Sequence, residues 1–461
     1  MVIIMVIFID LLDKVRDKSA VISVFGLGYV GLPLSSAFAS QGFRVVGVDV
    51  DVNRVEKVNR GQNYITDRFV DVHLNRLAHE GVLSASTDGE ATAKISDFII
   101  MCVPTPLTPV GTPNLDYLKS ASETISKGLQ AGKFVILEST GFPGMTEEVI
   151  KPILEKSGLK AGLDFGLAYS PERIDPGNKK YSIIDIPKVV GGLNKDCLKV
   201  VSALYGSCFR KLIAVSDIKT AEATKVLENT FRAINIAFVN ELSQLFETLE
   251  INIFEVIEAA ASKPFGFLPH YPSPGVGGDC IPVTPLYLNF KAKEVGKSLK
   301  FVELTAKINA EMPNHVLNLV LSGLYMAGKR LEETRIAVMG LAYKGGGSDT
   351  RLSPSIQFIK LLLSKTSDIV VFDPYVKEVY IDGKLLVSTD TIEKVVKKAD
   401  CAVFITSHPQ FKTLDLTLLK KEMNHKPVIV DTQNFFLKEK CENLGFIYQG
   451  LGKPHYKKES P

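Results

Sequence analysis

The sequence predicts an α/β fold in which two doubly wound domains are joined by a central helical domain with one long spine helix. Short β-branched stretches alternate with helix-length stretches in the first part of the chain, and this alternation resumes after about residue 330. Residues 216–261, between the two regions, contain neither glycine nor proline. We therefore expect domains at residues 1–210, 211–320 and 321–461.

Length and composition limit the classes of function. The chain has 461 residues, which is enough for about three domains of roughly 100–200 residues each. Its 54 Lys and Arg residues against 51 Asp and Glu residues give a net charge of +3, which argues against a nucleic-acid surface. A hydrophobic share of 46% with 23% charged residues is typical of a globular protein.

The longest apolar run lies at the start, at residues 1–8, and ends before Asp10. A bilayer span needs about 20 apolar residues, and neither a basic stretch nor a cleavage site marks this run as a signal peptide. We expect a short strand or an upstream start that precedes Met5, no membrane partner and a cytoplasmic location. The six cysteines form no CxxC pair, so we expect reduced thiols.

The first strand, turn and helix have a dinucleotide-binding pattern. Residues 21–25 form a β-branched stretch, Gly26-x-Gly28-x-x-Gly31 follows at once, and residues 29–40 have the length of a helix. Gly26 allows a tight turn, Gly28 lets a pyrophosphate approach the backbone, and Gly31 allows close helix–strand packing. The pattern predicts a Rossmann-like domain, with a purely structural glycine turn as the alternative.

Asp49 ends the next expected strand, residues 44–49. A carboxylate at this position accepts hydrogen bonds from the adenosine ribose hydroxyls and repels a 2′-phosphate. The sequence therefore predicts NAD, rather than NADP, as the cofactor.

Polar residues follow later strands of the same region. Residues 97–103 and 133–138 are strand-like, Thr140 follows the second of them, and Glu172 lies in a loop after a further apolar stretch. Ligands of open α/β sheets bind at the carboxyl ends of the strands, so both side chains are candidate site residues. Taken alone, they are also compatible with ordinary loop positions.

A long helix is predicted over residues 216–261, either continuous or interrupted near residue 250. Its apolar positions exceed the needs of one core, so it is either a spine with a dimer surface or a helix buried within one chain. Lys225 and Asn229 are four residues apart and share one helix face. Together they can stabilise an oxyanion, although a solvated helix face is the alternative.

Residues 262–285 are rich in proline and glycine and cannot form a helix or a central strand. The aromatic residues of this segment favour an ordered functional loop over a disordered linker. Cys280 follows Gly277-Gly278, which let the backbone approach a ligand. A thiol in this setting can act as a nucleophile, with an inert packing cysteine as the alternative.

A second α/β region follows. Four strands are expected at residues 335–340, 368–373, 401–405 and 427–431. Ser353-Pro354 has the pattern of a helix N-cap followed by proline at the first helical position, and residues 453–461 are expected to fray. The seven histidines show no metal-ligand spacing, and no GxSxG motif of a serine hydrolase is present.

Together these motifs resemble the UDP-glucose/GDP-mannose dehydrogenase family of nucleotide-sugar 6-dehydrogenases, in order and over nearly the whole chain. Within the family, the motif sequences are most similar to those of UDP-N-acetylglucosamine 6-dehydrogenases, notably in residues 175–178, 263–267 and 271–275. The motifs of the wider family are Phe25–Pro33, Cys102–Pro106, Glu138–Thr140, Ser170–Gly177, Leu227–Arg232, Pro274–Cys280 and Gly340–Lys344.

The resemblance implies an NAD-dependent four-electron oxidation of the C6 hydroxyl of a UDP-sugar, namely UDP-GlcNAc, to a UDP-hexuronic acid for polysaccharide biosynthesis. Cys280 would form a thiohemiacetal and then a thioester. Lys225 and Asn229 would hold the C6 oxygen, Glu172 would act as general base, and Thr140 would position water. The alternatives are UDP-ManNAc, UDP-GalNAc or UDP-glucose as substrate.

The resemblance also implies binding residues and a homodimer or higher homo-oligomer. Substrate-binding residues would be Glu172, Arg173, Lys225, Asn229, Tyr271, Gly277 and Lys344. Cofactor-binding residues would be Gly26, Gly28, Tyr29, Val30, Gly31, Asp49, Arg54, Thr105, Thr140 and Arg351.

The sequence departs from the family pattern near the nucleophile. Thr284 stands where an Asp is usual, and threonine cannot take a proton from water near neutral pH. Asp279 stands where His is common, and a neighbouring carboxylate raises the pKa of a thiol. Ser273, Leu352 and Gln433 also differ. A divergent homologue that binds NAD and a nucleotide sugar with low activity is therefore the contrasting hypothesis.

Overall fold

The computed structural model describes residues 2–65, 67–174, 180–366 and 368–454, so the expectations for residues 175–178 and for the end of the tail lie outside the described residues. The chain folds as two compact units. The first contains Met1–Glu228 and Leu286–Lys297, and the second contains Asn229–Pro285 and Ser298–Pro461. The division of the chain into three domains stays a prediction.

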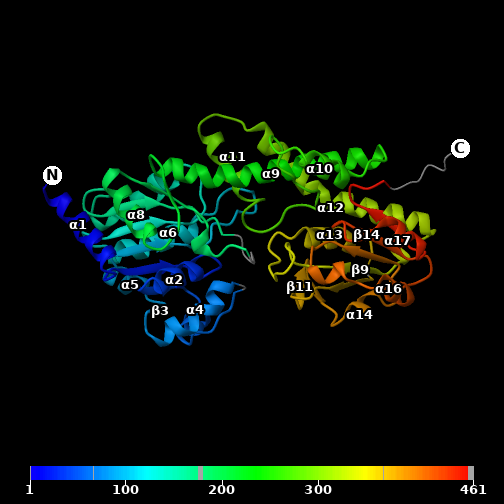
Figure 1. The fold of residues 1–461 in the computed structure, drawn as a ribbon, viewed down its shortest axis with the longest axis horizontal. Coiled ribbons are helices and arrows are strands. Elements are labelled where there is room, and N and C mark those ends of the chain that lie inside the picture. Colours follow the sequence, from blue (N-terminus) through cyan, green and yellow to red (C-terminus); the bar gives the residue numbers. More distant parts are fainter. Residues whose placement is uncertain (1, 66, 175–179, 367, 455–461) are drawn as a thin grey trace. The chain divides into compact units, whose positions relative to one another are not determined.

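The first unit is built on one sheet with the strand order β3-β2-β1-β4-β5-β6-β7-β8. Its helices α1, α2, α4, α5, α6 and α8 are labelled in the blue to green part of Figure 1. All neighbouring strands are parallel except β6 and β7. The strand order reverses between β1 and β4, and ligands of doubly wound sheets bind at such a switch point. The strands are β1 (Val21–Phe25), β2 (Arg44–Val48), β3 (Leu83–Ser86), β4 (Phe98–Met101), β5 (Phe134–Leu137), β6 (Gly166–Tyr169), β7 (Lys188–Gly192) and β8 (Leu212–Ala214).

Helices alternate with these strands and confirm the expected α/β class. Several begin at a side-chain cap: Asp51, Asp67, Asp88 and Asn194 each accept a backbone N–H of the first turn. The helices are α2 (Gly31–Ser40), α3 (Val52–Asn59), α4 (Arg68–His79), α5 (Gly89–Ile95), α6 (Asp116–Gly128), α7 (Lys151–Leu154) and α8 (Lys195–Gly206).

The N-terminal apolar run corrects one expectation. It belongs to helix α1 (Val2–Arg16) and not to a short strand. Phe8, Leu11 and Val15 of this helix are buried, and α1 packs against α8. Their spacing of three and four residues places them on one helix face, a period that continues beyond the apolar run itself.

The long helix is confirmed, with the interruption near residue 250. Helix α9 (Ile218–Thr248) ends before Glu250, which has a φ of +60°, and α10 (Ile253–Ala261) follows. Helices α11 (Thr284–Glu294) and α12 (Lys300–Ala327) come next. Phe231, Phe238 and Leu245 recur every seven residues on α9 and are exposed. This apolar stripe fits the expected dimer surface, which stays a prediction.

The second unit contains a parallel sheet with the order β10-β9-β13-β14-β15. Helix α12 packs against β14 and β15, and α13 (Pro354–Leu363) packs against α12. Ser353 caps α13 and proline occupies its first turn, as expected. The strands are β9 (Ile336–Met339), β10 (Ile369–Phe372), β13 (Cys401–Phe404), β14 (Val428–Asp431) and β15 (Ile447–Gly450), beside the hairpin β11 (Glu378–Ile381) and β12 (Lys384–Val387).

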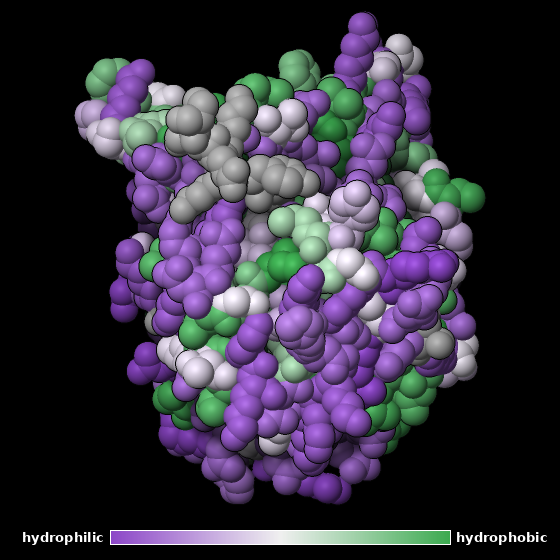
Figure 2. Space-filling model, turned by 90° about the vertical axis from the view of Figure 1, so that its right-hand side faces the viewer, coloured by the Kyte–Doolittle hydropathy of each residue, from purple (hydrophilic) through white to green (hydrophobic). Residues whose placement is uncertain are grey.

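Short helices complete this unit: α14 (Ile392–Val396), α15 (Pro409–Lys412), α16 (Leu416–Glu422) and α17 (Lys438–Asn443). Figure 2 shows a largely hydrophilic face on which hydrophobic residues form small separate groups. No helix in the described part of the chain is both long enough and apolar enough to cross a membrane.

Candidate active site

The glycine turn has the geometry expected for cofactor binding. Gly26 has a φ of +94°, and its N–H donates to the Val48 carbonyl at 2.7 Å. A Cβ added at Gly31 would lie 1.8 Å from the Gly26 carbonyl oxygen, so only glycine fits there. A Cβ added at Gly28 would meet no atom within 4 Å. The turn is therefore packed on the protein side and open at Gly28, which fits a dinucleotide.

Asp49 is held at this turn by the backbone. Its Oδ2 accepts the Leu27 N–H at 2.8 Å, and its Oδ1 accepts the Asp51 N–H at 3.0 Å. Arg54 Nη1 lies 3.4 Å from Asp49 Oδ2. The structure therefore brings the glycine turn, Asp49 and Arg54 together.

The remaining cofactor candidates of this unit lie near strand ends. Tyr29 and Val30 are half-buried in the turn before α2, and the Val30 side chain makes no cap hydrogen bond. The N–H groups of the first turn of a helix have no partner within the helix, which suits an anion such as a pyrophosphate. Thr105 is half-buried after β4, and its carbonyl accepts the Tyr287 hydroxyl at 2.8 Å.

Directly after β5, Glu138 belongs to a buried ionic group; its motif was noted in the sequence, but its partners Lys188 and Tyr205 were not. Lys188 Nζ lies 2.7 Å from Glu138 Oε2, and the Tyr205 hydroxyl donates to Glu138 Oε1. Next along the chain, the Ser139 hydroxyl donates to the Val103 carbonyl at 2.7 Å. These contacts fix the segment that ends in the half-buried Thr140.

Glu172 and Lys225 form a second buried ion pair. Lys225 Nζ lies 3.1 Å from Glu172 Oε2, and the two residues are only 5% and 8% exposed. Glu172 Oε1 accepts the Ile174 N–H. A buried charge needs a partner, and the two side chains supply opposite charges to one another. This pair can supply a fixed positive charge beside a general base.

Arg173 is also paired within this unit. Its Nε lies 3.1 Å from Glu228 Oε2, and its Nη1 donates to the Pro187 carbonyl at 2.6 Å. Its expected role in substrate binding stays a prediction.

Glu222 is a buried residue that the sequence analysis missed. It lies three residues before Lys225 on α9, and this spacing was the available signal. Its Oε1 accepts the Thr146 N–H at 2.8 Å and the Thr146 hydroxyl at 2.6 Å, and its Oε2 accepts the Gly144 N–H at 2.5 Å. Glu222 thereby ties α9 to the loop that follows Thr140. Burial raises the pKa of Glu222 to about 7, although these hydrogen bonds oppose the shift.

The replacement Glu222→Gln should remove a pH dependence of stability. Between the ordinary pKa of 4.5 and about 7, the folded chain binds this proton and the unfolded chain does not. The free energy of unfolding should therefore fall as pH rises through this window, by on the order of 3 kcal/mol from this group.

Urea unfolding at several pH values measures this effect as the difference between wild type and Glu222→Gln. Glu241→Gln, an exposed substitution on the same helix, is the control and should keep the wild-type dependence. Identical pH profiles for wild type and Glu222→Gln would contradict the prediction.

In the second unit, the Cys280 loop is fixed by its glycines. Gly278 has a φ of +79°, and its N–H donates to the Arg351 carbonyl at 2.9 Å. A Cβ added at Gly277 would lie 2.6 Å from the Tyr343 Cβ. Cys280 itself is half-buried, and its carbonyl accepts the Thr284 N–H at 2.9 Å, at the start of α11. The loop is thus ordered, as expected.

Asn229 contacts Thr284, the residue that stands where the family pattern has an Asp. Its Nδ2 donates to Thr284 Oγ1 at 3.1 Å, and both residues are buried. Asn240 fixes the loop upstream of Cys280, because its Oδ1 accepts the Ser273 N–H at 2.8 Å and its Nδ2 donates to Asn309 at 2.9 Å.

The other candidates of this unit are more exposed. Arg351 Nε lies 2.9 Å from Asp349 Oδ1, and Arg351 Nη1 forms an ion pair with Asp279. Asp279, beside the nucleophile, is therefore paired with a cation. The ring of Tyr271 is stacked on Phe254 at 6.1 Å. Lys344 is half-buried in the loop after β9.

The three aromatic residues that favoured an ordered loop, Phe265, Phe267 and Tyr271, are all exposed. Tyr271 stacks on Phe254, and Lys263 Nζ lies 4.9 Å from the centre of the Phe265 ring. No cluster of three or more potential metal ligands occurs among the described residues.

Models of known protein families match almost the whole chain. Three family models of the UDP-glucose/GDP-mannose dehydrogenase family match it in order. The model of the NAD binding domain matches residues 20–209, that of the central domain residues 219–311, and that of the UDP binding domain residues 337–438.

Individual relatives are similar over their full length. A UDP-N-acetyl-D-mannosamine dehydrogenase from Pyrococcus horikoshii is 36% identical over 432 residues, which are 94% of this chain and 99% of the relative. The solved structure of a UDP-D-ManNAc dehydrogenase from the same organism has a TM-score of 0.87 at 35% identity, covering 95% of this chain and 100% of that chain. An NDP-N-acetyl-D-galactosaminuronic acid dehydrogenase from Methanosarcina mazei has a TM-score of 0.81 at 29% identity, with 96% and 98% coverage.

Proposed function

The chain belongs to the UDP-glucose/GDP-mannose dehydrogenase family, and from this premise we propose that it oxidises the C6 hydroxyl of a UDP-N-acetylhexosamine to the carboxylate. NAD is its cofactor, and the turn that is open at Gly28 fits this cofactor. The observation that supports the proposal most directly is the ordered loop that holds Cys280 half-buried behind Gly277 and Gly278.

The substrate is proposed from two observations that favour different epimers. Several relatives are named UDP-N-acetyl-D-mannosamine dehydrogenases, which ranks UDP-ManNAc first. The motif at residues 263–267 resembles UDP-GlcNAc dehydrogenases, which ranks UDP-GlcNAc second. Both sugars have the same reacting carbon, so the proposed chemistry is common to them.

The proposed reaction uses Cys280 as the nucleophile. Loss of a hydride from C6 and of the hydroxyl proton first gives the C6 aldehyde. The Cys280 thiolate then adds to this aldehyde, forms a C–S bond and gives a thiohemiacetal whose oxygen takes a proton. Loss of hydride and of that proton from the thiohemiacetal leaves a thioester. Water then adds to the acyl carbon, the C–S bond breaks, and the thiolate and the carboxylate product are released. Bound NAD⁺ supplies the hydride acceptor for both oxidations.

The proposed roles of the other residues follow from their chemistry. Lys225 and Asn229 stabilise negative charge on the C6 oxygen. Glu172 takes protons, and Thr140 holds the water. Asp49 and the glycine turn hold the cofactor, with Tyr29, Val30, Arg54, Thr105 and Arg351. Arg173, Tyr271, Gly277 and Lys344 hold the nucleotide sugar.

NADH formation with limiting sugar tests the proposal. UDP-ManNAc, UDP-GlcNAc, UDP-GalNAc and UDP-glucose are compared at equal concentration. We expect two NADH per sugar, with the highest kcat/KM for one of the two sugars ranked above. No NADH with any of them, despite calorimetric binding of NAD, would replace the proposal by the low-activity binding homologue.

Hydrolysis of the thioester is expected to limit turnover. Thr284 is fully buried, and its hydroxyl accepts from Asn229, but it cannot act as a base near neutral pH. A sugar acyl adduct should therefore accumulate on Cys280 during turnover, visible as a mass increment of the quenched protein. The replacement Thr284→Asp should raise kcat by about a hundredfold and remove the adduct, because a positioned base contributes roughly 10²–10⁴-fold.

Thr284→Asn is the matched control, since it has the shape of aspartate without the base. It should leave kcat low and the adduct in place. The absence of an adduct from the turning-over wild type would show that hydrolysis is not limiting.

A further inference from the structure

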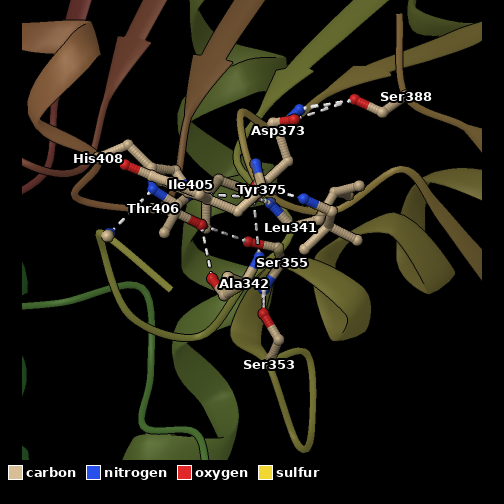
Figure 3. A network of polar contacts seen from close by, with 12 residues as sticks. Leu341, Ala342, Ser353, Ser355, Asp373, Tyr375, Ser388, Ile405, Thr406 and His408 are labelled. Carbon is tan, nitrogen blue, oxygen red and sulfur yellow. Dashed lines mark hydrogen bonds and ion pairs between the residues drawn. The ribbon is translucent and has the colours of Figure 1, made fainter. Parts of the chain in front are cut away.

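A buried polar network lies at the carboxyl end of the C-terminal sheet and plays no part in the mechanism above (Figure 3). It joins Asp373, directly after β10, to His408, which follows β13. His408 Nε2 lies 2.9 Å from Asp373 Oδ2, and neither side chain is exposed to solvent. Asp373, His408 and the loops that they contact all belong to the second unit.

Asp373 accepts hydrogen bonds at both oxygens. Its Oδ2 accepts the N–H groups of Leu341 at 2.7 Å and Ala342 at 3.1 Å. Its Oδ1 accepts the N–H groups of Tyr375 at 2.8 Å and Val376 at 3.0 Å. The backbone therefore surrounds this carboxylate with donors, which requires its ionised form.

The ionised Asp373 determines the tautomer of His408. Because the carboxylate only accepts, His408 Nε2 donates to it. Nδ1 of the neutral ring is then an acceptor, and the Gly346 N–H lies 3.1 Å from it. One imidazole thus connects Asp373 with the loop after β9.

The same loop is held at further points by the segment after β13. The Thr406 hydroxyl donates to the Ala342 carbonyl at 2.7 Å. A Cβ added at Gly345 would lie 2.0 Å from the Ser407 carbonyl oxygen, so the two backbones are in direct contact. Residues 341–346, the clamped loop, are therefore attached at both ends, and Tyr343 lies between the attachments.

Tyr343 connects the clamped loop to the nucleophile loop. A Cβ added at Gly278 would lie 2.8 Å from the Tyr343 ring, and one added at Gly277 would lie 2.6 Å from the Tyr343 Cβ. The backbone two and three residues before Cys280 therefore rests on this tyrosine. Any displacement of the clamped loop moves the support of the Cys280 loop.

We propose that His408, neutral and protonated on Nε2, is a positioning residue that holds the clamped loop and, through Tyr343, the loop that presents Cys280. The inference rests on the proposed function only in assigning Cys280 as the nucleophile. The contacts with Asp373, Gly346 and Tyr343 are those of the structure itself.

Two substitutions at His408 separate the hydrogen bond made by Nε2 from the hydrogen bond made by Nδ1. His408→Asn keeps an acceptor at the place of Nδ1 and loses the donor to Asp373. His408→Gln keeps a donor near the place of Nε2 and loses the acceptor for the Gly346 N–H. Ser388→Ala is the control, because the Ser388 hydroxyl accepts the Asp373 N–H at 2.8 Å and makes its other hydrogen bonds to the carbonyls of Asp373 and Thr389, outside the clamped loop.

The first readout is the rate at which iodoacetamide alkylates Cys280, followed by peptide mass spectrometry. It needs no substrate, so it is independent of whether the proposed sugars are turned over. We expect His408→Gln to raise this rate about tenfold, because a released loop exposes the half-buried thiol. The four buried cysteines should stay unlabelled, which separates this effect from unfolding.

The second readout is kinetic. With the sugar found active, His408→Gln should lower kcat about tenfold and change KM for NAD less than kcat, since of the proposed NAD-binding residues only Arg351 contacts the Cys280 loop. His408→Asn and Ser388→Ala should stay near wild type in both readouts. Tyr343→Ala should reproduce His408→Gln without altering His408.

Equal alkylation rates in wild type, His408→Gln and Tyr343→Ala would overturn the proposal. So would equal losses in His408→Asn and His408→Gln, because these would indicate a general need for the ring rather than for its acceptor nitrogen. An inactive wild type with the expected alkylation pattern would count against the proposed function and support the positioning role.

Discussion

The replacement Cys280→Ala will abolish the formation of two NADH per sugar and lower kcat at least about a thousandfold. The variant lacks the thiol that forms the C–S bond, so no acyl intermediate can arise, and losses of this size are typical when a nucleophile is removed. The measurement is NADH absorbance with limiting sugar, together with intact-protein mass.

Two further variants make this result specific. Cys280→Ser keeps a hydroxyl nucleophile of much higher pKa and should retain at most a trace of turnover. Cys102→Ala removes the other half-buried thiol and should keep kcat within about threefold, because burial raises the pKa of Cys102 well above its ordinary value and leaves it protonated. Full four-electron oxidation by Cys280→Ala would exclude the covalent mechanism.

The replacement Lys225→Met will lower kcat by about 10²–10³-fold and destabilise the fold. Removing one group that stabilises an oxyanion typically has an effect of this size. The partner Glu172 would remain as a buried charge without its cation, and breaking such a pair costs about 3–5 kcal/mol. Steady-state kinetics and urea unfolding measure the two effects separately.

The double variant Lys225→Met, Glu172→Gln separates stability from chemistry. With both charges removed, the free energy of unfolding should recover toward wild type, while kcat should stay at the level of the worse single variant or below. Lys219→Met, on the same helix but exposed, is the control for removing a lysine. Recovery of kcat in the double variant would show that Lys225 serves only to neutralise Glu172.

Elements whose signals are local in sequence could be predicted from the sequence. The glycine turn at Gly26, the Ser353 cap of α13 and the interruption of α9 near residue 250 are set by backbone sterics and capping within a few residues. The alternation of strands and helices predicted the α/β class in the same way.

Secondary structure could not be predicted from the sequence where the local signals were ambiguous. The apolar run at residues 1–8 fits a strand or a buried helix equally, and its helical form depends on packing against α8. Strands β6, β14 and β15 have only four residues each, and so short a strand gives a weak sequence pattern. β15 was not predicted.

The chemistry of single residues was visible in the sequence, but their partners were not. Cys280, Lys225, Asn229 and Asp49 were singled out from residue type and spacing, and the family resemblance assigned them roles. Their neighbours lie far along the chain: Glu172 is 53 residues from Lys225, and Thr284 is 55 from Asn229.

The tertiary structure alone decided which buried polar groups meet. Glu222 with Thr146, Glu138 with Lys188, and Asp373 with His408 are separated by 76, 50 and 35 residues, and no local rule pairs them. Asp373 and His408 meet because parallel strands bring their carboxyl ends to one edge of a sheet. In all three pairs the buried charge is stable only beside a donor or a counter-charge. The sequence by itself therefore determined the fold class and the reactive side chains, and the folded chain determined the protonation and the support of those side chains.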